Sequence, residues 1–202
     1  MPLISAVSLV ARSACAGCGA AGAALCPRCE DDLFPAPPLP PVEGSSSALA
    51  AWQYPGAAWS LVLDRKLSGR RAAARPMAVA VARTILRVGT SAEAVTWVPG
   101  RRRDTRARGY NHAELLGRAV AEVLGLDARS LLRRRGFRPD QAGLSGADRR
   151  RNMEDAFGAR PSVRAILLID DLVTTGATAR ACTMALRRAG AERVEVAAVC
   201  CA

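Results

Sequence analysis

The chain has 202 residues, half of them apolar, and a formal net charge of +11. This length suits one domain with a small appendage, and the composition excludes a wholly disordered chain. No apolar run approaches the roughly 20 residues that cross a bilayer, so we expect no membrane insertion. The positive charge favours phosphorylated ligands or nucleic acid as partners.

The first segment, "MPLISAVSLVARSACAG", is mildly apolar but has no basic stretch before its apolar part. It is therefore predicted to be a short helix rather than a signal peptide. The chain also has an odd number of cysteines, seven in all. Together these features predict a protein of the reducing cytoplasm without a disulfide framework.

Four of the cysteines form two C-x-x-C pairs within residues 15–29, "CAGCGAAGAALCPRC". Each pair is spaced to chelate, and the Gly and Pro residues let the backbone turn, so four thiolates can close tetrahedrally on zinc. Such a closed site is structural rather than catalytic. The alternatives are four unrelated reduced cysteines or a redox pair. The predicted zinc ligands are Cys15, Cys18, Cys26 and Cys29.

A stretch rich in Pro and Ser follows, "LFPAPPLPPVEGSSS", at residues 33–47. This composition is typical of an extended, exposed connector. It marks the one obvious boundary in the chain. We therefore predict an N-terminal helix with a zinc ribbon (1–34), a connector (35–50) and a main domain (51–202).

Helical and strand patterns alternate from residue 55 onward. Apolar residues at helical spacing predict helices at about 59–66, 75–88, 111–125 and 177–189. Apolar runs predict strands at 94–98, 165–169 and 193–199. This alternation predicts a doubly wound α/β fold with a mainly parallel sheet.

The helix that begins at Asn111 has a capping-box pattern, because Glu114 follows three residues later. We expect His112, the only histidine, to be a solvated residue of its first turn, with a catalytic base as the alternative reading. The stripe predicted to pack inward comprises Leu115, Ala119, Val120 and Val123.

The stretch "ILLIDDLVTTGAT", residues 166–178, brings two carboxylates to the end of an apolar strand. Ligands of open α/β sheets bind at this end of the strands, and buried carboxylates need partners there. Asp170 and Asp171 can accept the two vicinal hydroxyls of a ribose. The backbone N–H groups and hydroxyls that follow, at a helix N-terminus, can hold its phosphate. The predicted phosphate cradle comprises Thr174, Thr175, Gly176, Ala177 and Thr178.

Other nucleotide-binding motifs do not fit this stretch. The chain has no G-x-G-x-x-G for a dinucleotide and no G-K-[ST] for a P-loop. The remaining alternative is a plain acidic end of a strand. The favoured ligand is therefore a ribose that carries a 5-phosphate.

Residues 166–178 resemble the phosphoribosyl pyrophosphate (PRPP) motif of type I phosphoribosyltransferases. Four further segments extend the resemblance to the ComF/ComFC (GntX-like) family over nearly the whole chain: "CAGC…CPRC", "YPGAAWSLVLDRKLSGR", "VPGRRRDTRARGYNHAELLGRAVA" and "RPDQAGLSGADRRRNMEDAF". The resemblance implies a zinc ribbon on a phosphoribosyltransferase-type domain. It also implies an association with the uptake or handling of transforming DNA.

The resemblance implies further site residues. Pro99 and Gly100 would start the pyrophosphate loop, and Arg101 would bind the diphosphate with charge-assisted hydrogen bonds. Arg108, Tyr110 and Asn111 match an R-G-[FY]-N pattern of the family, which more often has Gln where this chain has His112. We take Asp170, Asp171 and Arg101 as the catalytic candidates.

Residues 133–157 show no period and are rich in Gly and Arg. By resemblance this segment is a mobile loop that closes over the ligand, with a solvated basic loop as the alternative. Its family positions are Gln141, Leu144, Arg150 and Asn152. Lys66, the only lysine, is either an anchor for phosphate or loop, or a chance occurrence.

Two classes of function follow. The first is a PRPP-dependent transferase or PRPP-binding protein, in which magnesium would bridge the diphosphate; nucleobase salvage is a variant of it, although we find no base pocket. The second is an accessory protein that binds single-stranded DNA through a basic track, with the PRPP pocket as a sensor or relic. With few aromatic residues for stacking, its DNA binding would be electrostatic and salt-sensitive. Competence or DNA-processing proteins are the further partners implied, and the oligomeric state is left open.

Overall fold

The structure is a computed structural model that describes residues 13–15, 17–23, 25–53, 74–100, 105–106, 109, 111–135, 156–160 and 163–202. The predicted helix at 59–66 and most of the predicted loop at 133–157 lie outside these residues. So do eight predicted site residues, namely Lys66, Arg101, Arg108, Tyr110, Gln141, Leu144, Arg150 and Asn152.

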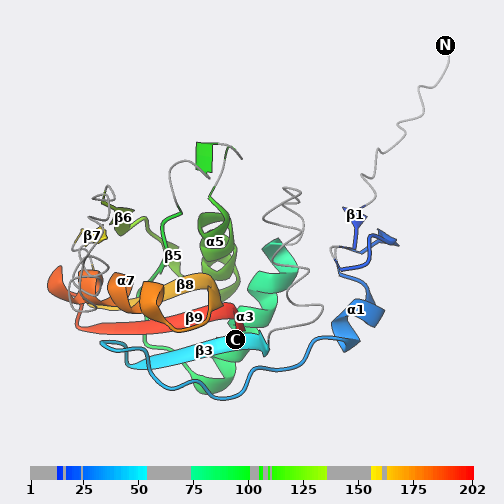
Figure 1. Cartoon of the computed structure of the whole chain (residues 1–202), viewed down its shortest axis with the longest axis horizontal. Coiled ribbons are helices and arrows are strands. Elements are labelled where there is room, and N and C mark those ends of the chain that lie inside the picture. The colour runs from blue at the N-terminus through cyan, green and yellow to red at the C-terminus, as the bar shows by residue number, and fades with distance from the viewer. Residues whose placement is uncertain are drawn as a thin grey trace, which may run out of the picture.

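A five-stranded sheet forms the centre of the main domain (Figure 1). Its strands follow the order β3-β9-β8-β4-β5, and every neighbouring pair is parallel. They span Ser47–Gln53 (β3), Arg193–Cys201 (β9), Ala165–Val173 (β8), Ala94–Trp97 (β4) and Asp127–Ala128 (β5). The predicted α/β fold with a mainly parallel sheet is thereby confirmed.

Helices cover both faces of this sheet, which explains why its central strands are apolar throughout. Helix α3 (Ala74–Val88) and helix α5 (His112–Leu124) contribute to one buried cluster, and helix α7 (Ala177–Arg188) contributes to the other. A short antiparallel pair, β6 (Leu132–Arg134) and β7 (Phe157–Ala159), packs on the same side as α7.

Strand β8 is longer than the apolar run predicted. Its pairing with β4 ends at Ile169, but its pairing with β9 continues to Val173. Asp170 and Asp171 therefore lie inside the strand rather than beyond its end. Asp170 is buried, whereas Asp171 is only partly buried.

Helix α5 begins as predicted but buries a different face. The Asn111 side chain caps it by accepting a hydrogen bond from the Ala113 N–H, 3.2 Å away. Glu114 does not complete a capping box, because its carboxylate pairs with Arg118 at 3.0 Å. The buried residues are His112, Ala113, Leu116, Gly117, Val120 and Ala121.

Two predictions for α5 were therefore wrong: the inward stripe, of which only Val120 is fully buried, and the solvated His112, which is 7% exposed. The physical reason is the approach of the helix to β4. At Gly117 an added Cβ would lie 2.8 Å from Cε3 of Trp97. The helix therefore faces the sheet with Gly117, which has no side chain, rather than with Leu115.

The N-terminal part consists of strands β1 (Ser13–Ala14) and β2 (Ala21–Gly22), which pair antiparallel, and helix α1 (Pro27–Asp31). The connector then pairs with the edge of the sheet through Pro35 and Trp52. Strand β3 begins at Ser47, inside the range predicted for the connector. Among the described residues, no helix is both long and apolar enough to cross a membrane.

Candidate functional site

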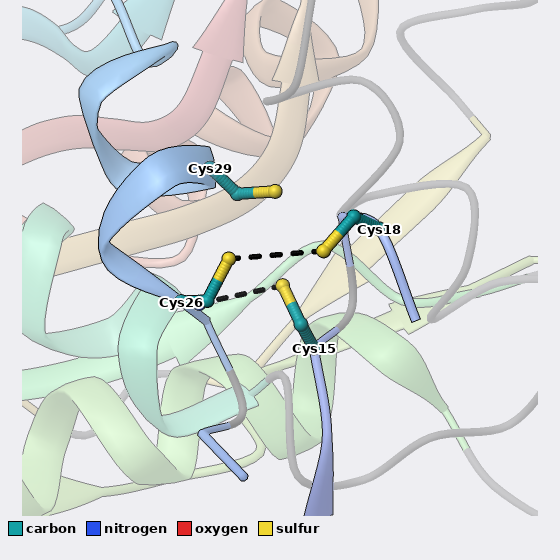
Figure 2. A group of neighbouring side chains, drawn as sticks. All are labelled: Cys15, Cys18, Cys26 and Cys29. Atoms are coloured by element: carbon teal, nitrogen blue, oxygen red, sulfur yellow. Dashed lines mark hydrogen bonds between the residues drawn. The ribbon is translucent and has the colours of Figure 1, made fainter. Parts of the chain in front are cut away.

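The four predicted metal ligands meet in space. The sulfur atoms of Cys15, Cys18, Cys26 and Cys29 all lie within 4.8 Å of one another and point toward a common centre (Figure 2). The Sγ atoms of Cys18 and Cys26 are 3.7 Å apart. Four sulfurs at tetrahedral corners around an ion, with metal–sulfur bonds of about 2.3 Å, lie about 3.8 Å apart. The cluster therefore has the size and donor set of a closed metal site.

Local backbone structure places each pair. Cys15 and Cys18 flank a turn in which the Gly19 N–H donates to the Cys15 carbonyl at 2.8 Å. Cys26 is the N-cap of α1, and Cys29 lies in the first turn of that helix. The second pair therefore sits at a helix start rather than in a second hairpin turn. The Cys26 N–H donates to Cys15 Sγ at 3.3 Å and so joins the two pairs.

The thiols have unequal acidity. Burial opposes ionisation of Cys15, but backbone N–H groups of Cys18, Cys26 and Gly17 outweigh it and lower its pKa to about 6. Burial, and then the neighbouring sulfurs, raise the pKa of Cys29 to about 12. All seven cysteines of the chain are free in this structure.

A hollow that is partly open to solvent lies where β8 turns into α7. Its lining includes Asp170 and every residue of the predicted phosphate cradle, Thr174–Thr178. Gly176 is the N-cap of α7 and has a positive φ of 71°. No acidic residue occupies the first turn of α7. A helix N-terminus of this kind attracts an anion through its N–H groups and its dipole.

The two aspartates differ. Asp170 is 8% exposed and lines the hollow, and its carboxylate accepts a hydrogen bond from the Asp171 N–H at 2.8 Å. Asp171 is half-buried and is absent from the lining. The structure therefore brings Asp170, but not Asp171, together with the cradle.

The predicted pyrophosphate loop starts beside this hollow. The Val98 N–H donates to the Ile169 carbonyl at 3.0 Å, so the end of β4 lies beside the part of β8 that precedes Asp170. Pro99 and Gly100 follow directly. A Cβ on Gly100 would lie 3.1 Å from Asn111 Oδ1, so the loop starts against the cap of α5.

Cys182 is a residue of this region for which the sequence indicated no role. It is fully buried on α7. Burial, and then the negative charge of Asp170, raise the pKa of its thiol well above 9.0, although Arg134 opposes the shift. An apolar helix stripe gave no signal that this thiol lies near a carboxylate. The raised pKa keeps the thiol neutral, so it adds no negative charge beside Asp170.

Similarity to known proteins agrees with the family resemblance. No protein-family model matches the chain. A segment of 95 residues, 44% of this chain, is 35% identical to Competence protein F of Haemophilus influenzae. The DNA utilization protein YhgH of Salmonella typhimurium and of Escherichia coli O157:H7 is also 35% identical, over 97 residues and 46% of this chain. The resemblance to the ComF family is confirmed over less than half of this chain.

The matched region spans 42% of the length of each of these relatives. Two solved structures also share features with the chain. The allosteric regulatory enzyme of purine biosynthesis is 18% identical, with a TM-score of 0.47, covering 68% of this chain and 30% of its own. Adenine phosphoribosyltransferase from Leishmania tarentolae is 12% identical, with a TM-score of 0.41, covering 72% and 76%. Both TM-scores lie below 0.5, so no property of either enzyme is transferred to this chain.

Proposed function

We propose that this chain is a PRPP-binding protein of the phosphoribosyltransferase kind that serves the handling of DNA. The observation that carries the proposal is the hollow itself, because one buried carboxylate and one helix N-terminus line it together. A carboxylate repels phosphate but accepts hydrogen bonds from hydroxyl groups, whereas the N-terminus of a helix attracts phosphate. A ribose 5-phosphate has a partner for each, because it carries both hydroxyl groups and a phosphate.

The roles of the residues follow from their places. The cradle at Thr174–Thr178 holds the 5-phosphate, and Asp170 accepts hydrogen bonds from the ribose hydroxyls. The diphosphate extends toward Pro99 and Gly100, where Arg101 is proposed to bind it. A magnesium ion would supply positive charge that offsets the charge of the diphosphate. The predicted role of Asp171, accepting a hydrogen bond from a ribose hydroxyl, stays a proposal, because its carboxylate does not line the hollow in this structure.

Transfer chemistry is the reaction that this arrangement would perform. The bond between the anomeric carbon and pyrophosphate breaks, and a bond from that carbon to a nucleophile forms. Positive charge near the pyrophosphate stabilises the charge that develops on it.

The PRPP proposal is tested by calorimetry with PRPP and magnesium. Wild-type protein should bind, and Asp170→Asn should bind at least about tenfold more weakly, because charged hydrogen bonds are lost. Thr90→Ser, near the amino end of β9, serves as the control and should bind like wild type. Equal affinities for wild type and Asp170→Asn would refute the assignment of the hollow.

The metal is proposed to be zinc in a structural role. Four thiolates in a closed tetrahedron leave no coordination position for substrate. Iron–sulfur chemistry uses the same donor set, so the test is elemental analysis. Freshly purified protein should contain about one zinc per chain; iron in its place would overturn the assignment.

Single-stranded DNA is a second candidate ligand, and one observation favours it. Above Gly158, the Nε atoms of Arg133 and Arg135 lie 3.3 and 3.0 Å from one point, the position of an added Cβ. Among the described residues, no carboxylate forms an ion pair with either arginine. Two like charges side by side fit a phosphodiester backbone. The curated relatives named for competence and DNA utilization agree with this candidate.

The DNA proposal is tested by titrating an oligonucleotide at two salt concentrations. Affinity should fall steeply with salt, and Arg133→Gln with Arg135→Gln should flatten that slope. Arg83→Gln with Arg87→Gln on α3, which removes two positive charges from the opposite face, is the control for overall charge. An unchanged slope in the double variant would remove β6 and β7 from the DNA site.

A further inference from the structure

Three consecutive connector residues, which we call the strap (Val42–Gly44), run along α7 from its N-terminus. Val42 Cγ2 lies 3.5 Å from the position of a Cβ on Gly176. Glu43 Oε2 lies 2.6 Å from Arg180 Nε. A Cβ on Gly44 would lie 2.9 Å from Met184 Sδ, so only glycine fits there. The strap therefore contacts successive turns of α7, beginning at the phosphate cradle.

The strap is anchored at both ends, which fixes these contacts. The Ser45 N–H and hydroxyl both donate to the Val42 carbonyl, at 2.8 and 2.7 Å. The Ser46 N–H donates to the Val194 carbonyl of β9 at 2.8 Å. Val42 also packs against the buried cluster beneath α7. Glu43 is consequently held beside α7 by its backbone neighbours as well as by its ion pair.

Arg180 is placed to act on the cradle. It lies four residues after Gly176, and side chains at i and i+4 share one face of a helix. Arg180 directly follows Ala179, the last residue of the lining of the hollow. Helical side chains lean toward the N-terminus of their helix, which brings an arginine at this position within reach of the first turn. Its side chain is 26% exposed, whereas that of Glu43 is 64% exposed, so solvent screens the arginine less.

The two charges have opposite effects on an anion in the hollow. The guanidinium attracts a phosphate bound at the start of α7, and the Glu43 carboxylate repels it and engages the same guanidinium. We propose that Glu43 competes with the ligand's 5-phosphate for Arg180. Arg180 is then a phosphate-binding residue of the cradle, and Glu43 is the contact that holds affinity down. This inference rests on the proposed function of the hollow.

The test is calorimetry with ribose 5-phosphate on wild type, Glu43→Gln and Arg180→Gln. Glu43→Gln should bind about threefold to tenfold more tightly, and Arg180→Gln more weakly by a similar factor. Both effects should shrink at high salt, because screening weakens interactions between exposed charges. Glu43→Asp, which keeps the charge, should bind like wild type.

Matched controls separate these effects from overall charge. Glu192→Gln removes one negative charge beyond the far end of α7, and Arg83→Gln removes one positive charge from α3; neither should change the affinity. If the ion pair only anchors the strap, Glu43→Gln and Arg180→Gln will shift affinity in the same direction, which overturns the inference. If wild type binds ribose 5-phosphate and Glu43→Gln does not tighten it, the inference alone fails. If wild type does not bind at all, the proposed function fails with it.

Discussion

A Cβ atom on Gly17 would lie 2.8 Å from the sulfur of Cys29. The first cysteine pair thus approaches the second through the one residue type that has no side chain. This contact, rather than the cysteine spacing alone, sets how closely the two pairs can meet around an ion.

Gly17→Ala should therefore weaken metal binding. The added methyl group must displace Cys29 Sγ or open the turn, since real Cβ contacts of this length do not occur. We expect substoichiometric zinc after dialysis against a weak chelator, measured by elemental analysis. Ala23→Ser, exposed on the same segment, should retain the wild-type content. A Gly17→Ala protein with full zinc content would show that the pairs have room to move.

Two glycines flank α7 with positive φ angles, Gly176 at 71° and Gly190 at 102°. Replacing either with Ala should destabilise the protein by about 1 kcal/mol, because L side chains disfavour this conformation. Only Gly176→Ala should also weaken ribose 5-phosphate binding, since Gly190 lies at the opposite end of the helix. Thermal unfolding and calorimetry check the two parts. Equal affinities in the two variants would contradict the cradle.

Gly117→Ala should destabilise the protein, although alanine normally stabilises a helix interior by about 1 kcal/mol relative to glycine. Here the new methyl would lie 2.8 Å from Trp97, which is 4% exposed and stacked beneath Arg118 at 5.2 Å. Overpacking of this kind costs about 1–3 kcal/mol. Urea unfolding measures whether the substitution lowers or raises the free energy of unfolding. A stabilised variant would mean that α5 shifts freely on the sheet.

Glu195 gives the fold a dependence on acid. It is 4% exposed and accepts hydrogen bonds from the Thr90 hydroxyl at 2.6 Å and from Ser91 at 3.2 Å. Burial opposes its ionisation, but these bonds and the charge of Arg193 outweigh burial and lower its pKa below the ordinary 4.5.

Because the folded state holds this carboxyl ionised, its stabilisation is fully present above pH 4.5 and is lost as the pH falls through the lowered pKa. Glu195→Gln should therefore lose stability at pH 7 and show less change between pH 5 and pH 3 than wild type. Glu93→Gln, exposed in the same region, is the control. Parallel stability curves for wild type and Glu195→Gln would contradict this role.

Local patterns predicted the elements and the metal ligands well. Chelating spacing is a property of a few adjacent residues, and helical periodicity located α3 within one residue of its start. The end of β8 was misjudged because its last residues pair only with β9, a partner far along the chain. For the same reason Asp171 was grouped with Asp170, although only Asp170 lines the hollow.

Tertiary contacts explain the other differences. Two apolar stripes compete on α5, and the contact of Gly117 with Trp97 selects between them. The burial of His112 follows from that choice. The contact of Val42 with Gly176 lies in a segment whose prolines give no periodic signal, so the strap could not be predicted from its sequence.

The proline-rich segment also covers β3, one of the two edge strands of the sheet. The Gln53 N–H donates to the Phe34 carbonyl at 2.8 Å, and Pro35 bridges Trp52 in antiparallel register. The other edge strand, β5, is only two residues long. Prolines have no N–H to donate, and so short an edge strand gives another chain little backbone to pair with. The composition that first marked a connector thus also guards the molecule against edge-to-edge aggregation.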